Sequence, residues 1–270
     1  MTIGNFIARA TQQLTKSGVI TARLDCLILL EDELLKDRAT LLAHTSDELS
    51  PETIETLEQK IVRRCAHEPL AYIRGFAEFY GWHFKVTPNV LVPRPETELI
   101  IEAFQQFTPK KDIRRVADIG TGSGCIGITL ALEHPNLHTD LYDISDEALK
   151  VAKQNSKLLG AHNTSIHKNN LLTNITQGYD AIVANLPYVP TNFPINKAAT
   201  HEPKIALFAG ADGLSDYQRF WQQVASLPKK PKIIITEAFP AQQHVLAQWA
   251  RRSGYALEYV QDFIQLFVKT

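Results

Sequence analysis

Residues 116–134 read VADIGTGSGCIGITLALEH and join a short apolar strand, a glycine-rich turn and an apolar helical segment. The glycines of the central segment Asp118–Gly124, DIGTGSG, allow a tight turn and let a ligand approach the backbone closely. Gly122-x-Gly124-x-x-Gly127 also matches a dinucleotide fingerprint, which is weak evidence when it stands alone. The stretch therefore predicts a strand–loop–helix unit with a ligand-binding turn.

Strands and helices alternate on the C-terminal side of this unit. Apolar strand-like segments are DLYDI at 140–144, YDAIVANLPY at 179–188, KIIITEA at 232–238 and FIQLFVK at 263–269, and an amphipathic helix, SDEALKVAKQNSKLL, occupies 145–159. Such alternation is typical of an α/β fold with a mostly parallel open sheet and helices on both faces.

The first part of the chain, residues 1–75, is expected to be helical because its apolar residues recur every three or four positions. Ser50-Pro51 has the form of an N-cap followed by proline at the first helical position. Residues 1–78 carry 9 Lys and Arg against 12 Asp and Glu, which is unlike a basic RNA-binding arm. We expect either a small acidic bundle that docks a protein partner or a cap that only covers the next domain.

The apolar pattern changes to a period of two within residues 76–97. FAEFYGWHFKV, a Thr-Pro-Asn turn at 87–89 and then VLVP predict a β-hairpin linker. Pro93-Arg94-Pro95 ends the hairpin, because a residue before proline is disfavoured in helix. Residues 98–270 form the third predicted domain, which holds the glycine loop.

Composition restricts the class of protein. The chain has 270 residues, is 44% hydrophobic and carries a formal net charge of −1. These values exclude a collagenous or wholly disordered chain, and no apolar run reaches the roughly eighteen residues of a membrane span. The balanced charge gives no global attraction to nucleic acid or membrane. Cys26, Cys65 and Cys125 lie far apart and the N-terminal residues lack a signal-peptide pattern, so we expect a cytoplasmic protein.

A carboxylate follows the next predicted strand. Asp143 lies nineteen residues after Gly124, at a strand end where a carboxylate can accept hydrogen bonds from ribose hydroxyls. A nucleoside-bearing cofactor is therefore expected. Two features favour S-adenosylmethionine over NAD. The loop looks like motif I of class I methyltransferases, and Asn185-Leu186-Pro187-Tyr188 follows an apolar strand at the end where ligands gather in open α/β sheets.

The NLPY segment offers acceptors suited to a planar nitrogen. The lone pair of an amide or exocyclic amine nitrogen is delocalised, which makes this nitrogen a poor nucleophile. Acceptors that hold both N–H groups can aim the lone pair at a sulfonium methyl group, so positioning and electrostatics replace a strong base. We expect Asn185 Oδ1 and the Leu186 carbonyl oxygen to be these acceptors, and the Tyr188 ring to pack against the planar group.

Several motifs together resemble the HemK/PrmC family, the release-factor glutamine N5-methyltransferases. The resemblance covers nearly the whole chain and follows the family's order, and the combination is far more specific than any one motif. The motifs are RRCAHEPLAYIRG at 63–75, EFYG at 78–81, LVPRPETE at 91–98, DIGTGSG at 118–124, Asp143, ALKVAKQN at 148–155, Asn185-x-Pro187-Tyr188, and Glu202-Pro203 with Ala206-Leu207 and Gly213-Leu214.

The resemblance implies a Rossmann-like class I methyltransferase sheet with one antiparallel edge pair, preceded by a helical domain that helps dock the partner. It implies S-adenosylmethionine as cofactor, S-adenosylhomocysteine as product, and the glutamine of the Gly-Gly-Gln loop in class I peptide release factors as substrate. No metal, no direct nucleic acid and no membrane are expected, and the default oligomeric state is a monomer. The implied catalytic residues are Asn185, Pro187 and Tyr188; the cofactor contacts are Gly120, Thr121, Gly122, Ser123, Gly124, Asp143, Asn170, Leu171 and Asn185; the substrate contacts are Asn185, Leu186, Pro187, Tyr188, Arg94 and Glu202.

Two positions and one segment depart from the family pattern. Leu186 stands where the family has proline in NPPY, and we predict that its carbonyl oxygen keeps the catalytic geometry. Asn170 stands where the family often has an acid near the adenine, and its amide can still accept a hydrogen bond from the amino group. ITEAFPAQ at 235–242 replaces the more usual L-E-x-G-x-x-Q.

Other interpretations stay open at this point. NLPY is also similar to the motif of ribosomal-RNA adenine-N6 dimethyltransferases. Adenine-N6 methylation of RNA or DNA predicts a basic groove, whereas residues 79–270 carry 19 Lys and Arg against 17 Asp and Glu. A non-catalytic module that binds the cofactor or a release factor is the second alternative. Arg94 either lines the pocket or only forms a solvated helix cap or an ion pair, and Glu202 either borders the active site or only belongs to a turn.

Overall fold

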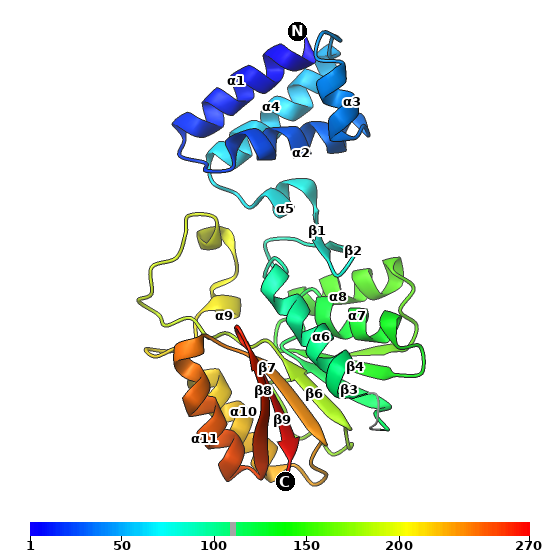
Figure 1. Cartoon of the computed structure of the whole chain (residues 1–270), viewed down its shortest axis with the longest axis vertical. Helices are drawn as coiled ribbons and strands as arrows, with labels where there is room; N and C mark the ends of the chain where they lie inside the picture. The colour runs from blue at the N-terminus through cyan, green and yellow to red at the C-terminus, as the bar shows by residue number, and fades with distance from the viewer. Residues whose placement is uncertain (109–111) are drawn as a thin grey trace. The chain divides into compact units, whose positions relative to one another are not determined.

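The chain folds as two units in the computed structural model, which describes residues 1–108 and 112–270. The first unit comprises Met1–Gly75 and Ile195–His201, and the second comprises Phe76–Pro194 and Glu202–Thr270 (Figure 1). The segment 195–201 therefore belongs with the N-terminal helices, although it lies inside the range 98–270 in the sequence. The division into domains 1–75, 76–97 and 98–270 stays a prediction.

The first unit is built from helices whose apolar faces meet in one core, as the spacing of its apolar residues predicts. Ser50 Oγ accepts a hydrogen bond from Thr53 N at 3.1 Å and Pro51 begins the following helix, so the predicted N-cap is confirmed. Arg64 and Asp25 form a mostly buried ion pair at 2.7 Å. The elements are α1 (Ile3–Lys16), α2 (Ala22–Leu34), α3 (Arg38–Ala43), α4 (Pro51–Cys65), α5 (Leu70–Arg74) and the 3-10 helix η2 (Ala199–His201).

The described residues of the second unit contain a seven-stranded sheet. All neighbours from β5 to β7 are parallel, whereas β9 is antiparallel to both β7 and β8. The predicted mostly parallel α/β fold with an antiparallel edge pair is confirmed. The strand order is β5 (Thr164–Lys168), β4 (His138–Asp143), β3 (Arg115–Ile119), β6 (Ala181–Ala184), β7 (Ile233–Glu237), β9 (Ile264–Lys269) and β8 (Tyr255–Gln261).

Helices cover both faces of this sheet (Figure 1). Successive strand residues point to opposite faces: Ile233 and Ile235 join one core, and Ile234 joins the other. No helix among the described residues combines the length and apolar character of a membrane span. The first core lies against α6 (Glu98–Phe107), α7 (Cys125–Glu133) and α8 (Asp146–Leu158), and the second against α10 (Ser215–Ser226) and α11 (Gln243–Arg252).

The strand order reverses between β3 and β6. From β3 the chain moves outward through β4 to β5, and it then returns to β6 on the other side of β3. In open α/β sheets, ligands bind outside the carboxyl ends of the strands at such a switch point. The glycine loop after β3 and the NLPY segment after β6 lie at these ends.

A hairpin is present within the range 76–97, but it covers only residues 76–85, and the predictions of its turn, of VLVP as its second strand and of its end at Pro93-Arg94-Pro95 were wrong. β1 (Phe76–Phe79) pairs with β2 (Trp82–Lys85), so the turn is Tyr80-Gly81 and not 87–89. Both turn residues have positive φ, 50° and 78°, which suits a two-residue turn that follows the strand twist. Thr87 instead begins a separate turn, with its carbonyl oxygen accepting from Val90 N at 3.1 Å.

Candidate active site

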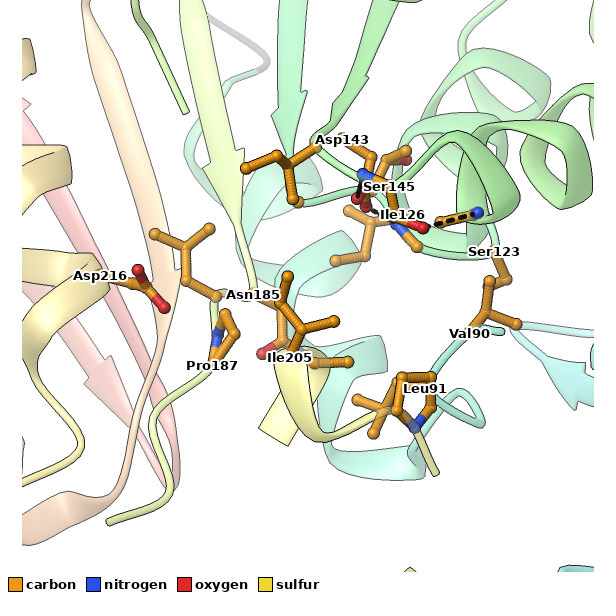
Figure 2. A pocket seen from close by; sticks show the side chains of 18 of the residues that line it. Val90, Leu91, Ser123, Ile126, Asp143, Ser145, Asn185, Pro187, Ile205 and Asp216 are labelled. Atoms are coloured by element: carbon orange, nitrogen blue, oxygen red, sulfur yellow. Dashed lines mark hydrogen bonds between the residues drawn. The ribbon is translucent and has the colours of Figure 1, made fainter. Parts of the chain in front are cut away.

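A pocket lies beside the carboxyl ends of β3, β4 and β6 (Figure 2). Its empty space is about 1060 Å³, part of which is open to solvent. Figure 2 shows Asp143, Ser145 and Ile126 together on one side of the pocket, and Asn185 and Pro187 apart from them. The predicted site residues that line it are Arg94, Gly120, Thr121, Gly122, Ser123, Asp143, Asn170, Leu171, Asn185, Leu186 and Pro187; Gly124, Tyr188 and Glu202 are not among the described residues lining it.

The glycine loop is shaped by its own backbone. Gly120, Gly122 and Gly124 have positive φ of 74°, 56° and 85°, a conformation that glycine adopts readily. The amides of Gly120 and Thr121 both donate to the Tyr142 carbonyl oxygen at 2.9 Å, which ties the loop to β4. A Cβ on Gly122 would meet no atom within 4 Å, so the loop leaves open space at this point.

Residues outside the pocket hold this loop in place. The Asp118 carboxylate, which is buried in β3, accepts hydrogen bonds from Thr121 Oγ1 at 2.5 Å and Gly127 N at 3.0 Å. Burial raises the pKa of Asp118 to about 6. Asn155 Nδ2 of α8 donates to the Ser123 carbonyl oxygen at 2.8 Å. The loop is thus fixed from both the strand and the helix that follows the next strand.

Asp143 is the last residue of β4, and both of its carboxylate oxygens accept hydrogen bonds from nearby backbone N–H groups. Oδ2 accepts from Gly122 N and Oδ1 accepts from Ser145 N, each at 2.9 Å. Burial raises the pKa of Asp143, and these two hydrogen bonds oppose that rise. Each oxygen keeps a further lone pair, so the carboxylate can also accept hydrogen bonds from a ligand.

Asn185 and Leu186 directly follow β6 and are tied to neighbouring elements. Asn185 Nδ2 donates to Thr97 Oγ1 of the 3-10 helix η1 (Pro95–Thr97) at 3.1 Å. Leu186 N donates to Tyr217 OH at 3.3 Å. The buried Leu186 side chain packs against the glycine loop, with Cδ2 3.0 Å from the position that a Cβ on Gly120 would take.

Tyr188 contacts the end of β7. Its hydroxyl donates to Glu237 Oε1 at 2.9 Å, and its ring packs edge-on against Phe239 with 4.9 Å between centroids. Burial raises the pKa of the Tyr188 hydroxyl well above its usual range. The packing of Tyr188 against a substrate group stays a prediction.

Arg94 and Glu202 form an ion pair at the edge of the pocket. Glu202 Oε1 accepts from Arg94 Nη2 at 2.5 Å, and Glu202 Oε2 accepts from Val92 N at 3.3 Å. The Glu202 side chain is 1% exposed, whereas that of Arg94 is 37% exposed and lines the pocket. Glu202 therefore acts on the pocket through Arg94. Ile205, from the short helix α9 (Lys204–Leu207), adds an apolar wall (Figure 2).

Asn170 and Leu171 line the pocket next to α10. Asn170 Oδ1 accepts from Arg219 Nη1 at 3.4 Å, and Arg219 is also paired with Asp216. Asp216 and Arg219 line the pocket as well. Leu171 has a positive φ of 53°, which is unusual for a branched side chain and shows that the backbone turns sharply here.

The sequence did not single out four residues that the structure places around this site. Glu237 ends an apolar strand, the same signal that identified Asp143, and could have been found in that way. Thr97 carries no local signal, because its contact with Asn185 joins positions 88 residues apart. The other two are Asp216 and Arg219.

The donors and acceptors of the pocket suit an organic cofactor. The Asp143 carboxylate and the Asn170 amide are hydrogen-bonding groups, and Ile126, Leu171 and Ile205 are apolar. Within residues 1–108 and 112–270, no group of three or more His, Cys, Asp or Glu side chains is arranged to hold a metal ion.

The chain contains a methyltransferase domain. Residues 95–208 match the family model of the Methyltransferase small domain, and residues 5–75 match that of the PrmC N-terminal domain. Among solved structures, the hMettl16 catalytic domain in complex with MAT2A 3′UTR hairpin 6 is 15% identical, with a TM-score of 0.55 and 82% of each chain covered. That likeness is one of fold alone.

The chain belongs to the release factor glutamine methyltransferase family. It is 41% identical over 206 residues to the release factor glutamine methyltransferase of Coxiella burnetii, covering 76% of this chain and 74% of that protein. It is 38% identical over 229 residues to that of Koribacter versatilis, covering 83% and 81%. The resemblance drawn from the motifs is confirmed.

Proposed function

We propose that the protein transfers a methyl group from S-adenosylmethionine to the side-chain amide nitrogen of the glutamine in the Gly-Gly-Gln motif of class I peptide release factors. The observation that carries the proposal is the meeting of two motifs in one pocket: the glycine loop with Asp143, and Asn185 with Leu186. The names of the relatives from Coxiella burnetii and Koribacter versatilis support a release factor as substrate.

The pocket residues fit this cofactor. Asp143 offers acceptors for ribose hydroxyls, and Asn170 offers an acceptor for the adenine amino group. Gly122 leaves open space in the loop, where a ligand can come close to the backbone. When bound, S-adenosylmethionine supplies a methyl group on a positively charged sulfur, and S-adenosylhomocysteine is the product.

Asn185 and Leu186 position the nitrogen nucleophile. Because Asn185 Nδ2 donates to Thr97, Asn185 Oδ1 is the end of the amide left to accept a substrate N–H. The Leu186 carbonyl oxygen is the second acceptor. When both N–H hydrogens of the substrate amide are held, the nitrogen lone pair can point only toward the methyl group. Such positioning accounts for much of the rate enhancement. The nitrogen becomes acidic after transfer, so water suffices to take the proton.

The N-terminal helices supply the proposed docking surface for the release factor. The match of residues 5–75 to the PrmC N-terminal domain supports this role. We further propose that the protein acts as a monomer in the cytoplasm and needs no nucleic acid.

Transfer of a labelled methyl group tests the proposal against its alternatives. The protein is incubated with labelled S-adenosylmethionine and an unmethylated release factor, with structured RNA or with duplex DNA. Label on the release factor alone is expected. Label on RNA or DNA alone would make adenine-N6 methylation the function, and cofactor binding without label on any of the three would make the protein a binding module.

Asp143→Ala is expected to weaken cofactor binding. The change removes the acceptors proposed for the ribose and releases Gly122 N, so the dissociation constant should rise by about 5- to 150-fold, or about 1–3 kcal/mol. Calorimetric titration with S-adenosylhomocysteine measures it. Asp146→Ala, at an exposed position nearby, is the matched control and should bind normally. Unchanged affinity of the Asp143 variant would contradict the ribose assignment.

Leu186→Pro is expected to keep or raise the turnover number and to lower stability. Proline keeps the carbonyl acceptor, and the hydrogen bond that it removes, Leu186 N to Tyr217 OH, is long at 3.3 Å. The loss of buried leucine contacts should lower the free energy of unfolding by about 1–2 kcal/mol. Steady-state kinetics and urea unfolding measure the two effects. An inactive, folded variant would show that the loop geometry depends on leucine.

A further inference from the structure

Glu237 is a buried carboxylate next to the Asn185–Tyr188 segment. It ends β7 and is 1% exposed. Tyr188 OH donates to Oε1 at 2.9 Å, whereas Oε2 has no hydrogen-bond partner of normal geometry among the described residues. A buried carboxylate with so few partners is costly and calls for an explanation beyond packing.

Thr97 is bonded to Asn185 and is a potential donor to this carboxyl group. The buried Thr97 hydroxyl oxygen accepts from Asn185 Nδ2 at 3.1 Å, and the hydroxyl still has its own hydrogen to donate. Burial raises the pKa of Glu237, and hydrogen bonding from Thr97, Tyr188 and Asn185 opposes that rise. Of these groups, Tyr188 makes a hydrogen bond of normal geometry to the carboxyl group, and Oε2 is the acceptor that stays open to the Thr97 hydroxyl.

We infer that Glu237 is a positioning residue that fixes which end of the Asn185 amide faces the substrate. When it is ionised, a carboxylate only accepts hydrogen bonds, so a Thr97 hydroxyl that turns its hydrogen toward Glu237 can only accept from Asn185, as it does at 3.1 Å. This direction turns the Asn185 amino group toward Thr97 and leaves Oδ1 for the substrate. The inference rests on the proposed function, which makes Asn185 Oδ1 the acceptor of a substrate N–H.

The orientation matters because the two ends of an asparagine amide have nearly the same shape. A reversed Asn185 would present its own NH₂ group to the NH₂ group of glutamine, and an attractive contact would become a repulsive one. Packing alone discriminates poorly between the two orientations. A partner that can only accept hydrogen bonds strongly favours the orientation in which the Asn185 amino group faces Thr97. Glu237 is such a partner, and it does not contact the substrate.

Protonation of Glu237 removes this selection, because a carboxylic acid donates as well as accepts. Burial first and then the charge of Glu96, in η1, raise the pKa of Glu237. The charge of this carboxylate also raises the pKa of three neighbouring groups, Cys125 of α7, Tyr188 and Tyr217 of α10. The turnover number should therefore fall as the pH drops through the pKa of Glu237, above the range of an ordinary glutamic acid.

Glu237→Gln is the decisive variant, since it keeps the shape and adds a donor. The turnover number should fall about 100-fold, and the dissociation constant for S-adenosylhomocysteine should stay unchanged. The decrease in turnover at low pH that titration of Glu237 causes in the wild-type protein should be absent. Thr97→Val should reproduce the loss, and Thr97→Ser, which keeps the hydroxyl, should restore activity. Glu258→Gln, the same change at an exposed position of β8, is the control.

Two kinetic results would overturn the inference. One is wild-type turnover and an unchanged decrease in turnover at low pH in the Glu237→Gln variant. The other is a loss of turnover with an equal loss of cofactor affinity, because that would mean general damage to the site.

A spectroscopic measurement separates this inference from the proposed function. In the wild-type protein, the Asn185 side-chain NH₂ hydrogens should show nuclear Overhauser contacts with the Thr97 side chain, and these should vanish in Glu237→Gln. Their persistence in the variant would overturn the inference. If the wild-type protein methylates no release factor, the proposed function fails, and the spectrum still decides whether Glu237 orients Asn185.

Discussion

Asn185→Ala should lower the turnover number for glutamine methylation by about 100- to 1,000-fold, the usual cost of removing one preorganised hydrogen-bonding group from an active site. The alanine variant loses the acceptor for one substrate N–H, and the remaining acceptor, the Leu186 carbonyl oxygen, holds the nitrogen in only one direction. A delocalised lone pair that is free to turn away from the methyl group reacts slowly. The loss should appear mainly in kcat.

The control for this variant is Asn136→Ala, an exposed asparagine between α7 and β4 that should behave as wild type. Single-turnover kinetics with an unmethylated release factor measure the chemical step, and calorimetry with S-adenosylhomocysteine measures cofactor binding. Activity of Asn185→Ala within a few-fold of wild type, with normal cofactor binding, would mean that Asn185 does not position the nucleophile.

Gly213→Ala should produce the second large effect, a loss of both stability and turnover. A Cβ at this position would lie 2.1 Å from the Tyr188 carbonyl oxygen and 2.7 Å from Gln242 Nε2. Gln242 Nε2 itself donates to that carbonyl oxygen at 2.8 Å and to the Asp212 carbonyl oxygen at 2.9 Å. Alanine must therefore push the backbone after Asn185 away, and a shift of about 1 Å at a reacting group costs about 100-fold in rate.

The positive φ of Gly213, 75°, adds a strain that needs its own control. Gly160 has a φ of 71° and no atom within 4 Å of an added Cβ. Gly160→Ala should therefore show the conformational strain alone, about 1–2 kcal/mol in urea unfolding, with normal turnover. If Gly213→Ala is no less stable and no less active than Gly160→Ala, the close contact with Tyr188 does not position the segment.

Local sequence patterns predicted the elements that carry strong signals. The apolar strands around the glycine loop, the cap at Ser50 and the helix after Ser145 formed where the spacing indicated. The edge strands β5 and β8 were not predicted, since their residues are mostly half-buried or exposed and lack a continuous apolar run. The prediction of the hairpin turn was wrong because Tyr80 has a φ of 50°. Tyrosine rarely adopts this conformation, so its presence in the sequence does not indicate a turn.

Long-range contacts account for what the sequence could not show at the site. The pairing of Arg94 with Glu202 joins residues 108 positions apart, and the contact between Thr97 and Asn185 spans 88. The departure at 235–242 also has a structural explanation. Phe239 packs edge-on against Tyr188, and its N–H donates to the Gln242 side chain at 3.1 Å, so this segment supports the Tyr188 backbone.

The most direct test of the account is peptide mass spectrometry of an unmethylated class I release factor after incubation with the protein and S-adenosylmethionine. One added methyl group is expected, located by fragmentation on the glutamine of the Gly-Gly-Gln motif, and none when Asn185→Ala replaces the wild-type protein. An unmodified glutamine under conditions in which cofactor binding is demonstrated, or a methyl group on another residue, would contradict it.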